Sequence, residues 1–107
     1  MEKYCIVLTT FANEADSTAV INAVLENKLA ACAQVINIAS HYTWQGKVQH
    51  EPEILVLFKT TWNLYDALES KIKSMHSYDV PEIIAIDIKR GSPSYLGWID
   101  EVTKKID

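Results

Sequence analysis

The stretch from Gln34 to Phe58 constrains the fold of this chain more than any other. Two extended runs are joined by the turn signal Gln45-Gly46, which predicts a β-hairpin. Each run has about ten residues or more, whereas strands in globular proteins usually have about five or six. Such a hairpin overhangs any compact sheet that 107 residues can build, and its edges would leave backbone groups unpaired. The hairpin therefore predicts that a second chain covers the overhang.

The side chains of the hairpin support an interface. Alternation places Tyr42 and Trp44 on one face, together with Ile36, Ser40 and Ile38. In a monomer these would form an exposed apolar patch, so we expect Tyr42 and Trp44 to contact another subunit. In the return strand, Glu51-Pro52-Glu53 predicts a bulge or an edge, because proline cannot donate to a ladder. His41 and His50 lie near the tip, where we expect them to be solvated or at an interface.

The remaining pattern predicts alternating strands and helices. A strand is expected over Tyr4–Phe11, a helix capped by Asn13 follows, and small residues from Leu29 begin the next strand. The continuous apolar run Ile54–Phe58 is expected to be covered on both faces. A further helix capped near Asn63, a strand over Ile83–Ile88 and a last helix opened by Pro93 complete the chain. The order βαββαβ plus a C-terminal helix predicts an α+β, ferredoxin-like sandwich, with residues 1–107 as a single domain.

The turn from Met75 to Ile84 is the first place to expect a site. It gathers an imidazole, a phenol and two carboxylates within a few residues, namely His76, Tyr78, Asp79 and Glu82. Pro81 fixes its own φ and holds Val80 extended, so the turn is stiff. The same stiffness also fits a turn that only connects a helix to a strand.

Composition excludes some classes of function. The net charge of −4 argues against binding nucleic acid, which needs a basic face. No apolar run is long enough to span a bilayer and no signal-peptide pattern opens the chain, so we expect no membrane role. Cys5 and Cys32 have no metal or redox spacing, which favours the cytoplasm. No nucleophile-elbow, phosphate-loop or zinc-protease motif is present, so we do not expect an enzyme.

Several blocks resemble one known family. They are Leu29-Ala30-Ala31-Cys32, Tyr42-Thr43-Trp44-Gln45-Gly46-Lys47, Lys59-Thr60, His76 to Ile83, and Tyr95-Leu96-Gly97-Trp98-Ile99. In combination they resemble the CutA family of divalent-cation tolerance proteins, from about residue 6 to residue 102. The resemblance implies a ferredoxin-like fold, a tight homotrimer like that of the PII signalling proteins, a cytoplasmic location and a link to copper tolerance.

The resemblance also implies a metal site, with departures. Members thought to bind copper carry a cysteine late in the first strand and two adjacent histidines, whereas this chain has Thr9 and the pair Met75-His76. A thioether suits Cu(I) better than Cu(II). We therefore expect weak copper binding, as Cu(I) or Cu(II), by His76 with Cys32 or Met75. Packing roles remain open for Cys5, Cys32 and Met75, and helix capping for His76.

A second expected site is a cleft between subunits. Lys59 and Glu82 each end an apolar strand, where a charge needs a partner or water, and an ion pair or a solvated rim is the other interpretation. We expect Trp44, Lys59, Tyr78 and Glu82 to line the cleft. Two functions remain: a trimer that binds or responds to metal ions, or a trimeric module that senses a small ligand or recruits proteins and binds metal incidentally.

Overall fold

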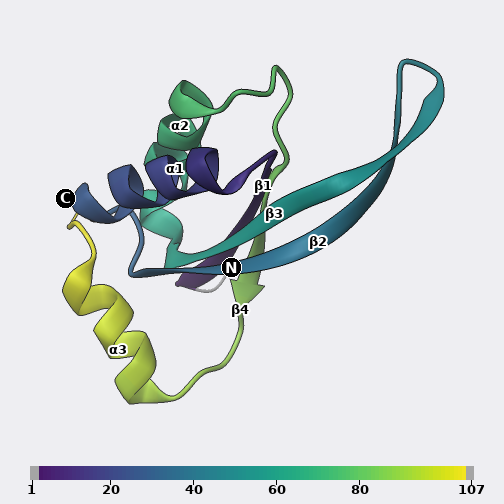
Figure 1. The fold of residues 1–107 in the computed structure, drawn as a ribbon. Helices are drawn as coiled ribbons and strands as arrows, with labels where there is room; N and C mark the ends of the chain where they lie inside the picture. The colour runs from purple at the N-terminus through teal and green to yellow at the C-terminus, as the bar shows by residue number, and fades with distance from the viewer. Residues whose placement is uncertain (1–2, 106–107) are drawn as a thin grey trace.

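The strands of the sheet follow the order β2-β3-β1-β4, and all neighbouring strands are antiparallel. This is seen in a computed structural model that describes residues 3–105 (Figure 1). The elements in chain order are β1 (Tyr4–Phe11), α1 (Glu14–Glu26), β2 (Cys32–Trp44), β3 (Lys47–Thr61), the 3-10 turn η1 (Trp62–Leu64), α2 (Tyr65–Met75), β4 (Ile83–Ile88) and α3 (Pro93–Val102). The α+β class is thereby confirmed.

The hydrophobic core lies between the sheet and the helices α1 and α2. Alternate residues of β1, such as Val7 and Phe11, are fully buried on this face, and Val56 and Phe58 of β3 join them. Leu64, at the cap of α2, and Leu68 and Ile72 within the helix are also fully buried. Helix α1 begins as predicted, because the Asn13 side chain accepts from the backbone N–H of Asp16 at 2.8 Å.

The opposite face of the sheet is only partly covered. Alternation places Ile36 of β2 and both Ile84 and Ile86 of β4 on this face, and each is about half exposed. Helix α3 reaches one end of it through Tyr95, which lies against Cys32 and Lys59. The expectation that Ile54–Phe58 is covered on both faces is therefore wrong within one chain.

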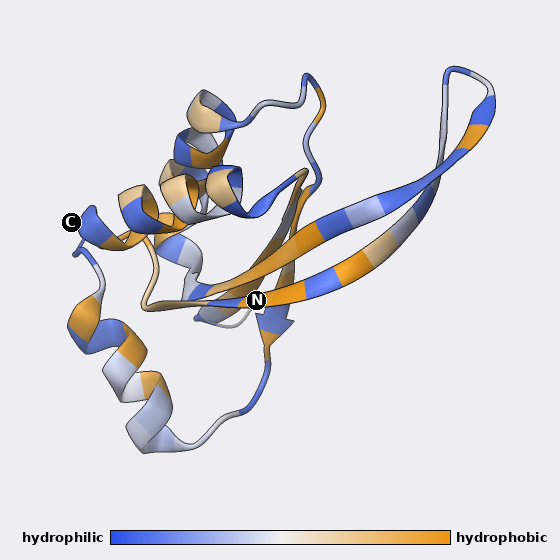
Figure 2. Ribbon diagram, in the orientation of Figure 1, coloured by the Kyte–Doolittle hydropathy of each residue, from blue (hydrophilic) through white to orange (hydrophobic). Residues whose placement is uncertain are grey.

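The β2–β3 hairpin extends well beyond the rest of the sheet (Figure 1). Its pairing is continuous from Cys32 with Lys59 to Trp44 with Lys47, whereas β1 ends beside Ile54. Among the described residues, the segment 47–53 therefore pairs with β2 alone, and in this overhang β3 is mostly hydrophilic apart from Val48 (Figure 2). The sequence predicted either a bulge or an edge at Pro52. Pro52 lies in this edge segment, and the register between β2 and β3 is unbroken, so there is no bulge.

Several local predictions were wrong. The second strand begins at Cys32 rather than Leu29, because Leu29 is buried and its carbonyl accepts from the Thr60 hydroxyl at 2.8 Å. No side chain caps α2, which follows a 3-10 turn instead of starting at Asn63. Met75 is 40% exposed, so the packing role left open for it is not seen within one chain. Among residues 3–105, no helix combines the length and apolar character needed to cross a bilayer.

Candidate functional site

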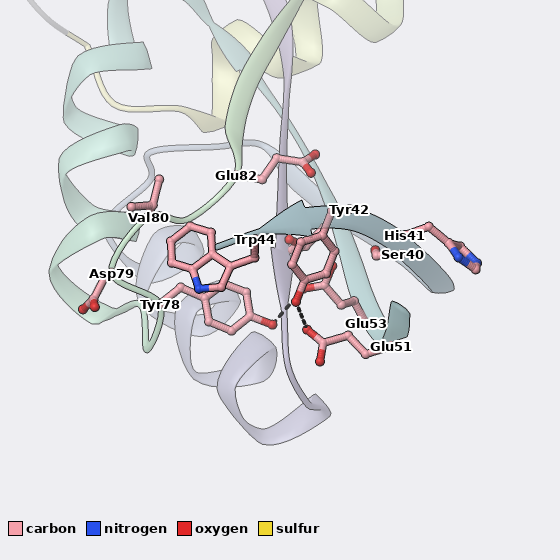
Figure 3. A pocket seen from close by; sticks show the side chains of 11 residues that line it. Ser40, His41, Tyr42, Trp44, Glu51, Glu53, Tyr78, Asp79, Val80 and Glu82 are labelled. Carbon is pink, nitrogen blue, oxygen red and sulfur yellow. Dashed lines mark hydrogen bonds between the residues drawn. The ribbon is translucent and has the colours of Figure 1, made fainter. Parts of the chain in front are cut away.

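A pocket lies where the hairpin overhang meets the connection between α2 and β4 (Figure 3). It has a volume of about 470 Å³, within the usual range for small-molecule sites. The hairpin can form one wall because its two strands continue past the end of β1. The lining residues are Thr10, Ser40, His41, Tyr42, Trp44, Glu51, Glu53, Tyr78, Asp79, Val80 and Glu82.

A polar contact with a buried acceptor joins Glu53 to Tyr78 in the pocket. The Tyr78 hydroxyl donates to Glu53 Oε2 at 2.7 Å, and Glu53 is only 8% exposed. Burial, and then the hydrogen bond to Glu53, raise the pKa of the Tyr78 phenol well above its usual value. Tyr78 therefore remains a proton donor at any physiological pH, and it holds one carboxylate oxygen in place.

A second tyrosine–glutamate pair lies closer to the solvent. The Tyr42 hydroxyl donates to Glu51 Oε1 at 2.5 Å, and this bond is the main cause that raises the pKa of Tyr42. Trp44 and Tyr42 extend the aromatic wall that Tyr78 begins (Figure 3). Four of the lining residues are acidic and none is Lys or Arg, so the pocket presents aromatic faces and negative charge. Such a lining disfavours anionic ligands.

His76 supports the turn that carries Tyr78. Its Nε2 lies 2.7 Å from the Thr10 carbonyl oxygen, which can only accept, so Nε2 carries the proton. Its Nδ1 accepts from the backbone N–H of Tyr78 at 3.1 Å, and its ring stacks on Phe11 with centroids 4.6 Å apart. Both ring nitrogens are thus engaged, and the imidazole anchors the turn to the end of β1.

Of the residues expected to bind copper, Cys32 and His76 are not brought together. Cys32 begins β2, pairs with Lys59 and contacts the Tyr95 hydroxyl at 3.6 Å. His76 lies beside Thr10, whose partner Leu55 precedes Lys59 by four residues along β3, or about 13 Å at the usual rise per residue. Met75 adjoins His76 in sequence and is partly exposed. Within residues 3–105, no three His, Cys, Asp or Glu side chains converge on a possible metal position.

Two further expectations concern Thr9 and Lys59. Thr9, which stands at the first-strand position, is fully buried, and its hydroxyl has no partner among the described residues. Lys59 does not line the pocket, although Trp44, Tyr78 and Glu82 do. Its ammonium group lies 3.5 Å from the Tyr95 hydroxyl and 5.4 Å from the centre of that ring. Three of the four residues expected to line a cleft, Trp44, Tyr78 and Glu82, therefore lie together in a pocket of one chain.

The comparisons with known proteins decide the family. The model of the CutA1 divalent ion tolerance protein family matches residues 5–102 of this chain. The chain belongs to the CutA1 family. The resemblance seen in the sequence is thereby confirmed.

Relatives of this CutA1 chain come from bacteria, plants and animals. The divalent-cation tolerance protein CutA of Thermus thermophilus is 38% identical over 99 residues, which are 92% of this chain and 96% of that protein. Protein CutA of Mus musculus is 39% identical over 98 residues, 91% of this chain but 55% of the mouse protein. The chain thus spans nearly all of the first relative and about half of the second. The crystal structure of CutA1 from Oryza sativa has a TM-score of 0.94 at 38% identity, covering 97% of this chain and 96% of that one.

Sequence reasoning missed Glu51 and Glu53 as members of the CutA1 pocket. The signal was present, because alternation along β3 places both on the face that carries Tyr42. Glu51-Pro52-Glu53 was interpreted only as an interruption of the strand, so the two glutamates were not assigned to the pocket.

Proposed function

We propose that this CutA1 chain functions as a homotrimer in divalent-cation tolerance, with ferredoxin-like subunits assembled as in the PII proteins. The overhanging hairpin carries the proposal. Within residues 3–105, no strand pairs with residues 47–53 on the side opposite β2, and Ile36, Ile84 and Ile86 on the open sheet face are each about half exposed. A neighbouring subunit that pairs with the overhang would satisfy the edge and bury apolar surface. The strand order β2-β3-β1-β4 supports the ferredoxin-like assignment. Sedimentation of the purified protein at low micromolar concentration tests the trimer.

The family description supports a role in the response to metal ions, and we propose that copper is the ion bound. Met75 and His76 are the candidate ligands, since a partly exposed thioether adjoins an imidazole. Binding through Nδ1 would require His76 to release the Tyr78 N–H. This cost predicts weak affinity.

A copper titration tests the assignment. Cu(I) should bind the wild type under reducing conditions, and His76→Ala should weaken binding by about tenfold or more, since even outer-shell changes cost that much. Met75→Leu conserves volume while removing the sulfur, so it should also weaken binding without disturbing the fold. Circular dichroism confirms that each variant is folded. If both variants bind Cu(I) like the wild type, the Met75–His76 assignment is wrong.

A trimeric module that senses a small ligand or recruits a protein is the second candidate. The pocket favours it, because aromatic and acidic side chains surround a cavity of about 470 Å³ while the nitrogens of His76 are already engaged. In a trimer, Lys59 of a neighbouring subunit would complete the expected cleft with Trp44 and Glu82. Capture from lysate in the presence of a chelator distinguishes the two candidates: a stoichiometric partner retained without metal favours the module.

We further propose a cytoplasmic, non-enzymatic role without nucleic acid or membrane partners. The net charge of −4 and the two free thiols, Cys5 and Cys32, support it.

A further inference from the structure

His41 and His50 face each other across the hairpin. They are direct partners in the β2–β3 register, with ring centroids 5.1 Å apart and planes inclined by 26°. Both residues are exposed, and the His41 side chain points away from the aromatic and acidic centre of the pocket (Figure 3). Two imidazoles are thus held side by side by backbone pairing rather than by a flexible loop.

These two rings differ from His76 in what their nitrogens do. No hydrogen bond joins either ring to another residue in the described range 3–105, whereas both nitrogens of His76 are engaged. The neighbouring pairs on the same face of the hairpin are Ala39 with Pro52 and Thr43 with Val48, none of which is charged. The face therefore holds neither a cation to repel a metal ion nor a carboxylate to orient the rings.

The spacing suits two ligands of one metal ion. Cross-strand partners have Cβ atoms about 4.5–5.5 Å apart. With Zn–N bonds of about 2.0–2.1 Å, two imidazole nitrogens on a tetrahedral ion lie about 3.4 Å apart. Exposed rings reach this separation by rotating about their side-chain torsions, and water completes the coordination. We propose that His41 and His50 form a divalent transition-metal site for Zn²⁺, Ni²⁺ or Cu²⁺, the ions that imidazole suits.

The site is separate from the proposed Met75–His76 copper position and does not depend on it. A pair of borderline imidazole ligands favours divalent ions, whereas a thioether favours Cu(I). Because the ligands come from opposite strands, a bound ion would also link β2 to β3 beyond the end of β1. The ion binds only the paired hairpin, so it should stabilise the overhang.

The test uses untagged protein, titrated with ZnCl2 in a non-chelating buffer and followed by calorimetry. We expect one ion per chain in the wild type, and at least about a tenfold loss of affinity in His41→Ala and in His50→Ala, since each removes a ligand. Thr43→Ala is the matched control, because it changes a neighbouring side chain on the same face of the hairpin without removing an imidazole, and it should bind Zn²⁺ like the wild type. His76→Ala is titrated beside it to detect any binding at that histidine. With Ni²⁺, two of the three imidazole signals in histidine-labelled NMR spectra should broaden.

The outcomes separate this site from the copper proposal. Zn²⁺ affinity that is lost in His76→Ala but kept in the His41 and His50 variants would overturn the hairpin site. So would a wild-type protein that binds no Zn²⁺, as expected if a neighbouring subunit covers this face. A failed Cu(I) titration with intact Zn²⁺ binding at His41 and His50 would instead overturn only the Met75–His76 position.

Discussion

At the scale of single residues, the buried carboxylate of Glu53 is a group of the pocket that needs a hydrogen-bond donor. A carboxylate accepts hydrogen bonds and cannot donate them, and Glu53 is nine-tenths buried with Tyr78 as its donor. Burial and this bond raise the pKa of Tyr78, which keeps the phenol protonated and the bond intact. The pair holds the connection between α2 and β4 against the hairpin.

Tyr78→Phe should destabilise the protein by about 1–3 kcal/mol, because it leaves a buried acceptor without its donor. Urea denaturation measures the loss, and Tyr42→Phe is the control, since its partner Glu51 is exposed and can turn to water. The raised pKa of Tyr78 means that its stabilisation is complete below the ordinary phenol value of 10.0 and is lost as pH rises through the folded pKa. The difference between wild type and Tyr78→Phe should therefore be constant up to about pH 10 and shrink above it. An equal loss from the two variants would contradict this role for Tyr78.

The sequence indicated residue types here better than contacts. Tyr78, Trp44 and Glu82 were predicted to share a cleft, and the three line one pocket. The partners of Tyr78 and Tyr42 were not predicted; they are glutamates 25 and 9 positions away along the chain. The contact between Tyr78 and Glu53 depends on how the connection between α2 and β4 packs against the hairpin, which no local pattern specifies.

At the scale of elements, strands and helices were predictable where an apolar period or a cap marks them. Asn13 caps α1 and Ser92 caps α3, with Pro93 at its first turn. The predicted boundaries were wrong where tertiary contacts determine the residue at which an element begins. Leu29 enters the core before β2 begins, and the chain passes through the 3-10 turn Trp62–Leu64 before α2. Propensity cannot predict such contacts.

Pro81→Ala should lower the free energy of unfolding by about 1 kcal/mol. Alanine at this position raises the conformational entropy of the unfolded chain, so more entropy is lost on folding. Thermal unfolding measures the change. Asp79→Ala lies in the same turn and leaves the backbone restriction by proline in place, so it should alter the melting temperature less. A melting temperature for Pro81→Ala equal to or above that of the wild type would show that the native φ does not suit proline.

At the scale of the whole molecule, one chain leaves two surfaces unsatisfied. The overhang of the hairpin ends in Tyr42 and Trp44, and the sheet face carries half-exposed isoleucines at Ile36, Ile84 and Ile86. The overhang was predictable from strand length alone, and the shared face of Tyr42 and Trp44 from alternation. A head-to-tail contact between hairpin and sheet edge would form a ring when its rotation closes, but these features do not fix how many subunits would close it. The number three comes from the resemblance to the CutA family.

We predict an obligate homotrimer in which Trp44 contributes to the contact. Analytical ultracentrifugation at low micromolar concentration should give a trimer and no folded monomer. Trp44→Glu should weaken it, because a carboxylate at an apolar contact must lose its water without gaining a partner. Thr43→Glu is the matched control, since it adds the same charge at the next position of β2, on the opposite face of the hairpin. A folded monomer would overturn both the assembly and the cleft between subunits. A trimer weakened equally by both variants would instead indicate general charge repulsion at the tip, because a contact through Trp44 must distinguish the two faces of one strand.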